Sequence, residues 1–166
     1  MKFSVLLSIY YKESPEHLSC SLDSILAQSL QPDEIILVKD GPLTAELDSV
    51  ITRYEVKIPN LRVIPLNMNV GLGNALNEGL KHCNNDLIAR MDTDDICRPD
   101  RFAKQINVFR NNPNVDVVSA WIEEFEGTEK NIISVRRLPE MHSEIYEYGK
   151  KRCPINHPVV MFRKTA

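Results

Sequence analysis

Short apolar runs recur along the chain and alternate with segments of a different hydrophobic period. The runs are rich in Val, Ile and Leu, end in polar residues, and lie at residues 3–11, 34–41, 61–66 and 86–92. Continuous apolar runs of this length are typical of strands that are buried on both faces of a parallel sheet. The pattern therefore predicts four such strands.

A helical pattern follows each of these runs. Between residues 16 and 30, Leu18, Leu22 and Ile25 recur at the spacing that brings side chains onto one face of a helix. Three further helices are predicted at residues 44–57, 73–84 and 98–112, the last with Pro99 near its first turn. Strand and helix thus alternate four times, which predicts an α/β fold with a mostly parallel central sheet, helices on both faces and right-handed crossovers.

The end of the chain has a weaker pattern. Residues 115–126 predict the last strand of the core sheet, residues 142–153 a short helix and residues 157–164 a strand. The length of 166 residues lies within the range of roughly 100–200 residues expected per domain. We therefore expect a single domain over residues 1–166.

Composition narrows the classes of function. The balance of 43% apolar and 26% charged residues is that of an ordinary globular protein, and the net charge of -3 argues against a nucleic-acid partner. The four cysteines form no CxxC pair, which argues against a zinc knuckle or a redox motif and favours reduced thiols. No apolar run approaches the ~20 residues that span a bilayer.

The polar residues that end the strands are the first candidates for chemistry. In a parallel sheet, ligands bind outside the carboxyl ends of the strands. Tyr10, Tyr11, Asp40 and residues 92–95 are therefore expected to converge at one edge. Because side chains alternate along a strand, we expect one tyrosine in the core and the other in the crevice, where its ring is available to stack on a base.

An acidic loop follows the fourth apolar run. Asp92, Asp94 and Asp95 lie within four residues of one another. Carboxylates at positions i and i+2 of a turn can aim at one point, and oxygen ligands suit Mg²⁺ or Mn²⁺, which keep open positions for substrate phosphates. The alternative interpretation is that Asp94 or Asp95 caps the helix that starts near Pro99. Both interpretations stay open from the residues alone.

Two further polar stretches allow two interpretations each. Asp40 begins a turn, since "KDGP" has the residues that turns favour. In "NVGLGNALNEG", Gly71 and Gly73 begin a glycine fingerprint, but Leu76 stands where a dinucleotide site needs Gly or Ala. Here Gly71 either supplies a positive φ, with Asn74 as the helix cap, or contacts a ligand.

Taken together, "SVLLSIYYKE", "DEIILVKDG", "NVGLGNALNEGL" and "IARMDTDDICRPDRF" carry a resemblance. In this order and spacing they resemble family 2 glycosyltransferases, which have the GT-A fold. The resemblance covers about residues 2–125, and "NHPVVMFRKTA" is similar to the region after the core sheet in bacterial members. No single motif is specific, but the ordered set is.

The resemblance implies a donor site. Its uracil contacts fall on Ser8, Ile9 and Tyr10, and Asp40 matches the acid that accepts a bond from the uracil ring N–H. Tyr11 stands where the family has Asn, which leaves the choice between the two tyrosines open. In full, the implied nucleotide-binding residues are Ser8, Tyr10, Asp40, Gly71, Asn74, Arg90 and Asp92.

The resemblance also implies a metal site and a reaction. Asp92 and Asp94 match the DXD pair that binds Mn²⁺ or Mg²⁺, and Asp95 fits a supporting role at the helix start. The implied reaction is inverting transfer from a UDP-sugar to an acceptor hydroxyl in surface polysaccharide biosynthesis. The implied acceptor is a glycan or a lipid-linked sugar, which places the work in the cytoplasm at the inner face of a membrane.

The catalytic base of such enzymes lies beyond the core sheet, and no matching acid stands before Ala166. We therefore expect an N-terminal fragment without the acceptor part, and the base stays unassigned. The nearby acids at 123, 124, 126 and 129 fit a solvated strand end equally well, and His157 fits a structural turn.

Three other functions are alternatives to this one. A sugar-nucleotide-binding module without transfer activity would have the same donor residues. A sugar-phosphate nucleotidyltransferase needs a glycine-rich loop after the first strand, and "YYKESPEH" has no glycine. A receiver domain needs an acidic pair after the first strand, which is also missing.

Overall fold

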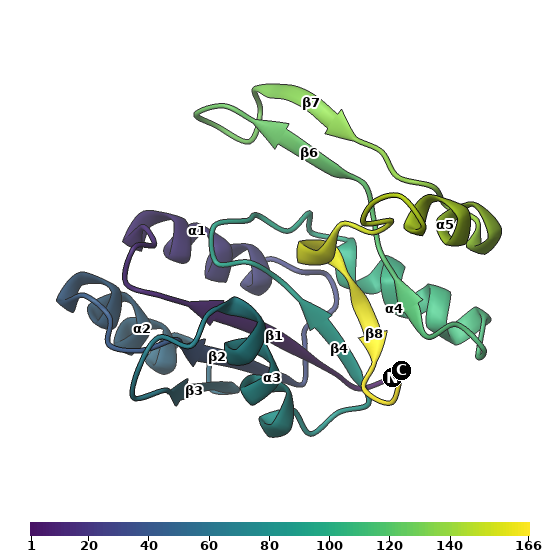
Figure 1. Ribbon diagram of the computed structural model, residues 1–166. Coiled ribbons are helices and arrows are strands. Elements are labelled where there is room, and N and C mark those ends of the chain that lie inside the picture. The colour runs from purple at the N-terminus through teal and green to yellow at the C-terminus, as the bar shows by residue number, and fades with distance from the viewer.

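A six-stranded sheet forms the centre of the computed structural model, which describes residues 1–166 (Figure 1). Its strand order is β3-β2-β1-β4-β8-β5. The first four strands in this order are mutually parallel: β3 (Leu61–Pro65), β2 (Glu34–Lys39), β1 (Phe3–Ile9) and β4 (Leu87–Arg90). The predicted α/β class and mostly parallel sheet are confirmed.

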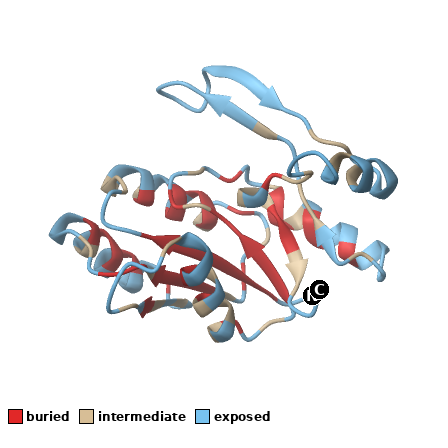
Figure 2. Ribbon diagram, viewed as in Figure 1, coloured by how far each residue is buried: buried red, intermediate tan, exposed pale blue.

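Helices cover both faces of the sheet, as predicted. Three of them pack with one face in the larger apolar cluster: α1 (Pro15–Leu26), α2 (Ala45–Lys57) and α4 (Arg101–Asn111). The opposite face is covered by α3 (Leu72–His82). Figure 2 shows the result, with β1, β2 and β4 buried between the helical layers.

Local sequence explains where the helices begin. Ser14 precedes α1 and accepts a hydrogen bond from the backbone N–H of His17, and Thr44 does the same for Leu47 at the start of α2. These contacts satisfy backbone donors that the first turn leaves without a partner. Phe102 then joins α4 to the start of β1, because its ring meets Phe3 edge-on at a centroid distance of 5.2 Å.

The segment at residues 115–126 differs from the prediction of one core strand. Only β5 (Val117–Val118) joins the sheet, at its edge. The chain then leaves the sheet and forms a separate hairpin of β6 (Ile122–Phe125) and β7 (Ile132–Arg136), which projects from the body in Figure 1. The reason is that β8, and not this segment, pairs with β4. Only the two residues of β5 pair with the other edge of β8.

The C-terminal predictions are confirmed in part. A helix, α5 (His142–Gly149), forms within residues 142–153 as expected. Residues 157–164 begin as a single 3-10 turn, η1 (His157–Val159), before the strand β8 (Met161–Arg163). All four cysteines are free, as expected, and no helix has the length and apolar character needed to cross a membrane.

The start of α3 corrects one expectation. Gly71 has a φ of 84°, as predicted, but it is itself the N-cap. Asn74 does not cap the helix: it lies inside the first turn, and its amide donates to the carbonyl of Val70. Further along α3, Gly79 lies against the sheet so closely that an added Cβ would lie 2.5 Å from Val38 Cγ2.

We therefore expect Gly→Ala to have opposite effects on the free energy of unfolding at two positions of α3. Gly79→Ala should lower the free energy of unfolding by about 1–3 kcal/mol, because the methyl group overpacks the contact with Val38 and Leu6. Gly73→Ala, with no atom within 4 Å of its added Cβ, should raise it by up to about 1 kcal/mol through helix propensity. Urea denaturation measures both, and equal effects at the two positions would contradict the close packing of α3.

Candidate functional site

The strand order brings the predicted residues to the carboxyl edge of the sheet. Asp40 directly follows β2, Tyr10 directly follows β1, and Asp92 is the second residue after β4. Since β1 lies between β2 and β4, two inter-strand spacings separate the ends of the outer pair, which is about 10 Å. Asp40 and the acidic loop thus stand on either side of the end of β1.

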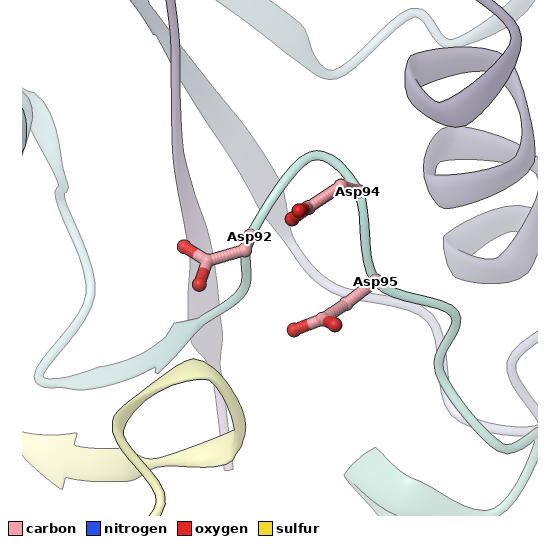
Figure 3. A group of neighbouring side chains, drawn as sticks. All are labelled: Asp92, Asp94 and Asp95. Atoms are coloured by element: carbon pink, nitrogen blue, oxygen red, sulfur yellow. The ribbon is translucent and has the colours of Figure 1, made fainter. Parts of the chain in front are cut away.

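The three carboxylates of the acidic loop converge. One oxygen atom from each of Asp92, Asp94 and Asp95 lies within 4.8 Å of the other two. In Figure 3, Asp94 and Asp95 point across the opening of the loop toward the limb that carries Asp92, whose own carboxylate is turned outward. Asp94 is exposed, while Asp92 and Asp95 are half-buried.

Helix α1 fixes the backbone of this loop. Ser21 donates its hydroxyl to the carbonyl of Asp92 at 3.1 Å, and Ser24 accepts from the backbone N–H of Cys97 at 3.0 Å. The amide of Gln28 donates to the carbonyl of Arg98 at 2.7 Å. Both ends of the loop are therefore tied to a helix that is itself part of the core.

Two buried arginines support the loop from the other side. Arg101 donates to the carbonyl of Arg90 at 2.7 Å and to Cys97 Sγ at 3.1 Å. Arg90, with 5% of its surface exposed, donates from Nη2 to Asp92 Oδ1 at 2.5 Å. The buried guanidinium groups supply positive charge to a loop that would otherwise carry only carboxylates.

Burial is the main reason why the carboxyl groups of this site are harder to ionise than usual, and their mutual repulsion adds to it. Burial, with the neighbouring charges of Asp92 and Asp94, raises the pKa of Asp95 to about 6. Burial also raises the pKa of Asp92, and Asp94 adds to that effect although Arg90 opposes it. The pKa of Glu13 is raised too, by burial and then by Asp94 and Asp92. The site therefore has an excess of negative charge that a cation would relieve.

The capping interpretation of the loop is wrong. The N-cap of α4 is Asp100, and neither Asp94 nor Asp95 donates or accepts a hydrogen bond at the start of that helix. The donor set contains only carboxylate oxygens, which fits Mg²⁺ or Mn²⁺ better than a softer metal. By charge and by ligand chemistry, the residues fit a divalent cation.

Asp40 has a structural role at the other end of the site. It is 3% exposed, and its two carboxylate oxygens accept the backbone N–H groups of Val70 and Gly71 at 2.7 and 3.0 Å. This contact joins the end of β2 to the start of α3. Asn74, in the first turn of α3, donates to the carbonyl of Val70, so Asp40, Gly71 and Asn74 all lie around the start of this helix.

The first-strand residues differ from the expectation. Ser8 is buried within β1, and its carbonyl accepts from Thr93 of the acidic loop. Neither tyrosine is in the core: Tyr10 is 37% exposed and Tyr11 is 50% exposed, and their rings meet edge-on. The strand ends at Ile9, so the alternation of a strand does not extend to these two positions.

Two residues near the acidic loop were missed as site residues. Glu13 lies in the turn after β1, where a single Glu among polar residues gives no sequence signal. His157 contacts Arg90 through Nδ1. Its position at the start of a predicted strand was a usable signal, because a strand antiparallel to β4 begins at the same edge at which β4 ends.

Comparison with known proteins agrees with this geometry. The profile of the family described as "Glycosyl transferase family 2" matches residues 4–165. The chain belongs to glycosyltransferase family 2. The match covers the whole sheet and the acidic loop, so the predicted family resemblance is confirmed.

Curated relatives of this family-2 chain are similar along nearly all of it. The amylovoran biosynthesis glycosyltransferase AmsE of Erwinia amylovora is 45% identical over 98% of this chain and 60% of its own length. An Escherichia coli UDP-Gal:alpha-D-GlcNAc-diphosphoundecaprenol beta-1,3-galactosyltransferase is 43% identical over 98% of this chain and 58% of its own length. The chain thus spans about three fifths of the length of these relatives.

Solved structures confirm the fold. TarS of S. aureus, in complex with UDP-GlcNAc, has a TM-score of 0.71 at 21% identity, over 99% of this chain and 46% of its own. The mannosyltransferase PcManGT of Pyrobaculum calidifontis, in complex with GDP-Man and Mn²⁺, has a TM-score of 0.70 at 18% identity, over 98% of this chain and 44% of its own. Both are GT-A glycosyltransferases, which confirms the predicted GT-A architecture.

The raised pKa of Asp95 predicts how stability depends on pH without metal. The folded state holds a proton on Asp95 up to a pKa of about 6, whereas the unfolded chain releases it at about 3.9. The free energy of unfolding should therefore fall as pH rises from about 4 to about 6 and stay low above that range. Asp95→Asn should remove this loss and raise the free energy of unfolding at pH 7.5 by about 1–2 kcal/mol, discounted because the carboxylate is partly solvated.

Urea denaturation at pH 4 and pH 7.5 measures this effect, with EDTA present throughout. Asp86→Asn is the matched control, because Asp86 is exposed and its side chain makes no hydrogen bond. A gain for Asp95→Asn that is equal at the two pH values would show that ionisation of the Asp95 carboxyl group is not its cause.

Proposed function

We propose that the chain provides the donor side of an inverting, metal-assisted glycosyltransferase that uses a UDP-sugar. The observation that carries the proposal is the cluster of Asp92, Asp94 and Asp95, which is fixed at the carboxyl edge of a GT-A sheet and has uncompensated negative charge. A site built in this way takes a divalent cation and, through it, a diphosphate. Asp94 and Asp92 would hold the metal.

A bound Mn²⁺ or Mg²⁺ supplies Lewis-acid stabilisation of the charge that develops on a diphosphate leaving group. The chain's own residues set the conditions for this. Arg90 holds Asp92 in one orientation, and the bonds from α1 keep the loop from spreading under its own repulsion. Asp95 contributes a further negative charge beside the pair.

The nucleoside would extend from the acidic loop toward Asp40. The spacing of two strands leaves room for a ribose between a diphosphate at Asp94 and a base near Asp40. Tyr10 or Tyr11 would stack on the base, since both rings are accessible beside the end of β1. Ser8, Gly71 and Asn74 would line the same path. UDP as the nucleotide is supported by two proteins, the E. coli relative that uses UDP-Gal and the TarS complex with UDP-GlcNAc.

The acceptor would approach from the side of the hairpin. A cavity of about 660 Å³ extends from Asp95 along α4 to Trp121 and Phe125 of the hairpin region. Its lining combines charged and apolar side chains, which suits a sugar joined to an apolar group. The E. coli relative acts on a GlcNAc-diphosphoundecaprenol, and AmsE serves amylovoran biosynthesis. We therefore propose a lipid-linked acceptor, polysaccharide biosynthesis, and work at the inner face of a membrane.

A catalytic base is not assigned. Of the acids considered from the sequence, Glu123 pairs with Arg98 and Glu124 accepts from Ser134, so both have partners on or beside the hairpin. The alternative to an enzyme is a chain that binds the nucleotide sugar without transferring it, and the residues of the donor site are the same in the two cases. Release of UDP in the presence of acceptor distinguishes them.

Nucleotide binding should depend on the metal through Asp94. UDP at about 100 times its dissociation constant, with Mn²⁺, should raise the free energy of unfolding by about 2.7 kcal/mol, which is roughly 5–10 °C in Tm. Asp94→Asn should abolish the part of the shift that depends on Mn²⁺ and leave the apo Tm unchanged or slightly raised, because Asp94 is exposed and its charge only adds to the repulsion on Asp92 and Asp95. Differential scanning fluorimetry with UDP, GDP and ADP tests this, and stabilisation by GDP or ADP but not by UDP would contradict the uracil assignment.

The two roles of Asp40 can be separated by experiment. Asp40→Asn should lower the apo free energy of unfolding by about 1–3 kcal/mol, because an amide cannot accept from both Val70 and Gly71. If Asp40 also meets the base, the variant should bind UDP more weakly and bind pyrophosphate with Mn²⁺ as the wild type does. Isothermal titration calorimetry measures both ligands, and unchanged UDP affinity would leave Asp40 with its structural role alone.

A further inference from the structure

His157 stands at the same edge of the sheet as the acidic loop. It is the first residue of η1, the turn that precedes β8. Because β8 is antiparallel to β4, its start lies beside the end of β4, where Arg90 leads into the loop. Figure 3 shows the turn of this segment, in yellow, close to Asp92 and Asp95.

The backbone around His157 is fixed on three sides. The buried side chain of Asn156 donates to the carbonyl of Ala120 at 2.9 Å, and its own carbonyl accepts from Ser119 at 3.1 Å. Gln105 of α4 donates to the carbonyl of Val159 at 2.7 Å. The backbone N–H of Arg90 donates to the carbonyl of Val160 at 2.9 Å. The backbone that carries the exposed His157 side chain is therefore held by strand, helix and sheet edge.

The contact between His157 and Arg90 has only one chemical form. Arg90 Nη1 lies at hydrogen-bond distance from His157 Nδ1, and a guanidinium group can donate but not accept. Nδ1 must therefore be the acceptor, without a proton, and a neutral ring then carries its proton on Nε2. The other amino group of the same guanidinium, Nη2, donates to Asp92. Arg90 thus bridges His157 and Asp92.

We propose that His157 is a positioning residue of the donor site, which acts through Arg90 on Asp92. Arg90 is buried, and a long arginine side chain keeps rotational freedom unless its guanidinium group is bonded on more than one side. The bond from His157 removes that freedom, so that Nη2 and the carboxylate of Asp92 keep one geometry. Partners that orient metal ligands in this way typically matter by 10–100-fold in metal affinity. The inference rests on the proposed function, since it assumes a metal at Asp92 and Asp94.

Isosteric variants separate the two nitrogen atoms of His157. In Asn, the amide oxygen can take the place of Nδ1 and accept from Arg90, whereas Gln places its amide near Nε2. Titration of the chain with Mn²⁺ alone should show about 10–100-fold weaker binding for His157→Ala. Affinity should be largely restored in His157→Asn and should stay low in His157→Gln. His142→Ala, at an exposed position of α5, is the control and should bind like the wild type.

Two spectroscopic measurements distinguish a positioning role of His157 from direct coordination of the metal. The imidazole ¹⁵N spectrum of the apo chain should show the tautomer with the proton on Nε2. Electron spin echo measurements of bound Mn²⁺ should show no coupling to a histidine nitrogen. Nitrogen coupling, rescue by Gln and not by Asn, or wild-type affinity in His157→Ala would each overturn the proposal.

The same samples distinguish this inference from the proposed function. For each variant, the titration with Mn²⁺ is carried out first, and a titration with UDP at saturating Mn²⁺ comes after it. A wild-type chain that binds Mn²⁺ with the predicted dependence on His157 but does not bind UDP would support the positioning role and contradict the donor proposal. A wild-type chain that binds UDP, but whose Mn²⁺ affinity does not depend on the residue at position 157, would overturn the positioning role alone.

Discussion

Repulsion among the carboxylates of the acidic loop is the constraint on which the site depends. Asp92, Asp94 and Asp95 would move apart in a free loop, because a charged oxygen gains solvation by doing so. The structure prevents this through hydrogen bonds from α1 to the backbone at both ends of the loop. Burial, together with the charges of Asp92 and Asp94, raises the pKa of Asp95 to about 6, so ionising all three carboxyl groups costs free energy. A rigid loop with this charge is prepared for a cation.

The fold supplies the rigidity from residues far apart in sequence. Arg101 of α4 holds the carbonyl of Arg90, and Arg90 in turn holds Asp92. Phe102, the next residue of α4, packs on Phe3 at the start of β1. The run from the loop into α4 therefore joins the core and the site, so a change that loosens the core near Phe102 would also loosen the metal ligands. Stability and donor binding are coupled in this part of the molecule.

Much of this could be predicted from the sequence, because the parallel strands are continuous apolar runs and their ends are marked by polar residues such as Asp40 and Asp92. The failures have physical causes. The hairpin was missed because β8, late in the chain, takes the place beside β4, and no local pattern at residues 115–126 shows that. His157 was assigned to a turn for the same reason, since its contact with Arg90 spans 67 residues. The tyrosines were misplaced because β1 ends at Ile9.

The central claim is that the acidic loop binds a divalent cation together with a nucleotide diphosphate. Crystals grown with Mn²⁺ and UDP, measured at the manganese absorption edge, test it most directly. The account predicts one anomalous peak within about 2.0–2.6 Å of carboxylate oxygens of Asp94 or Asp92 and of the diphosphate. A fully occupied UDP without such a peak, or a peak elsewhere on the chain, would contradict it.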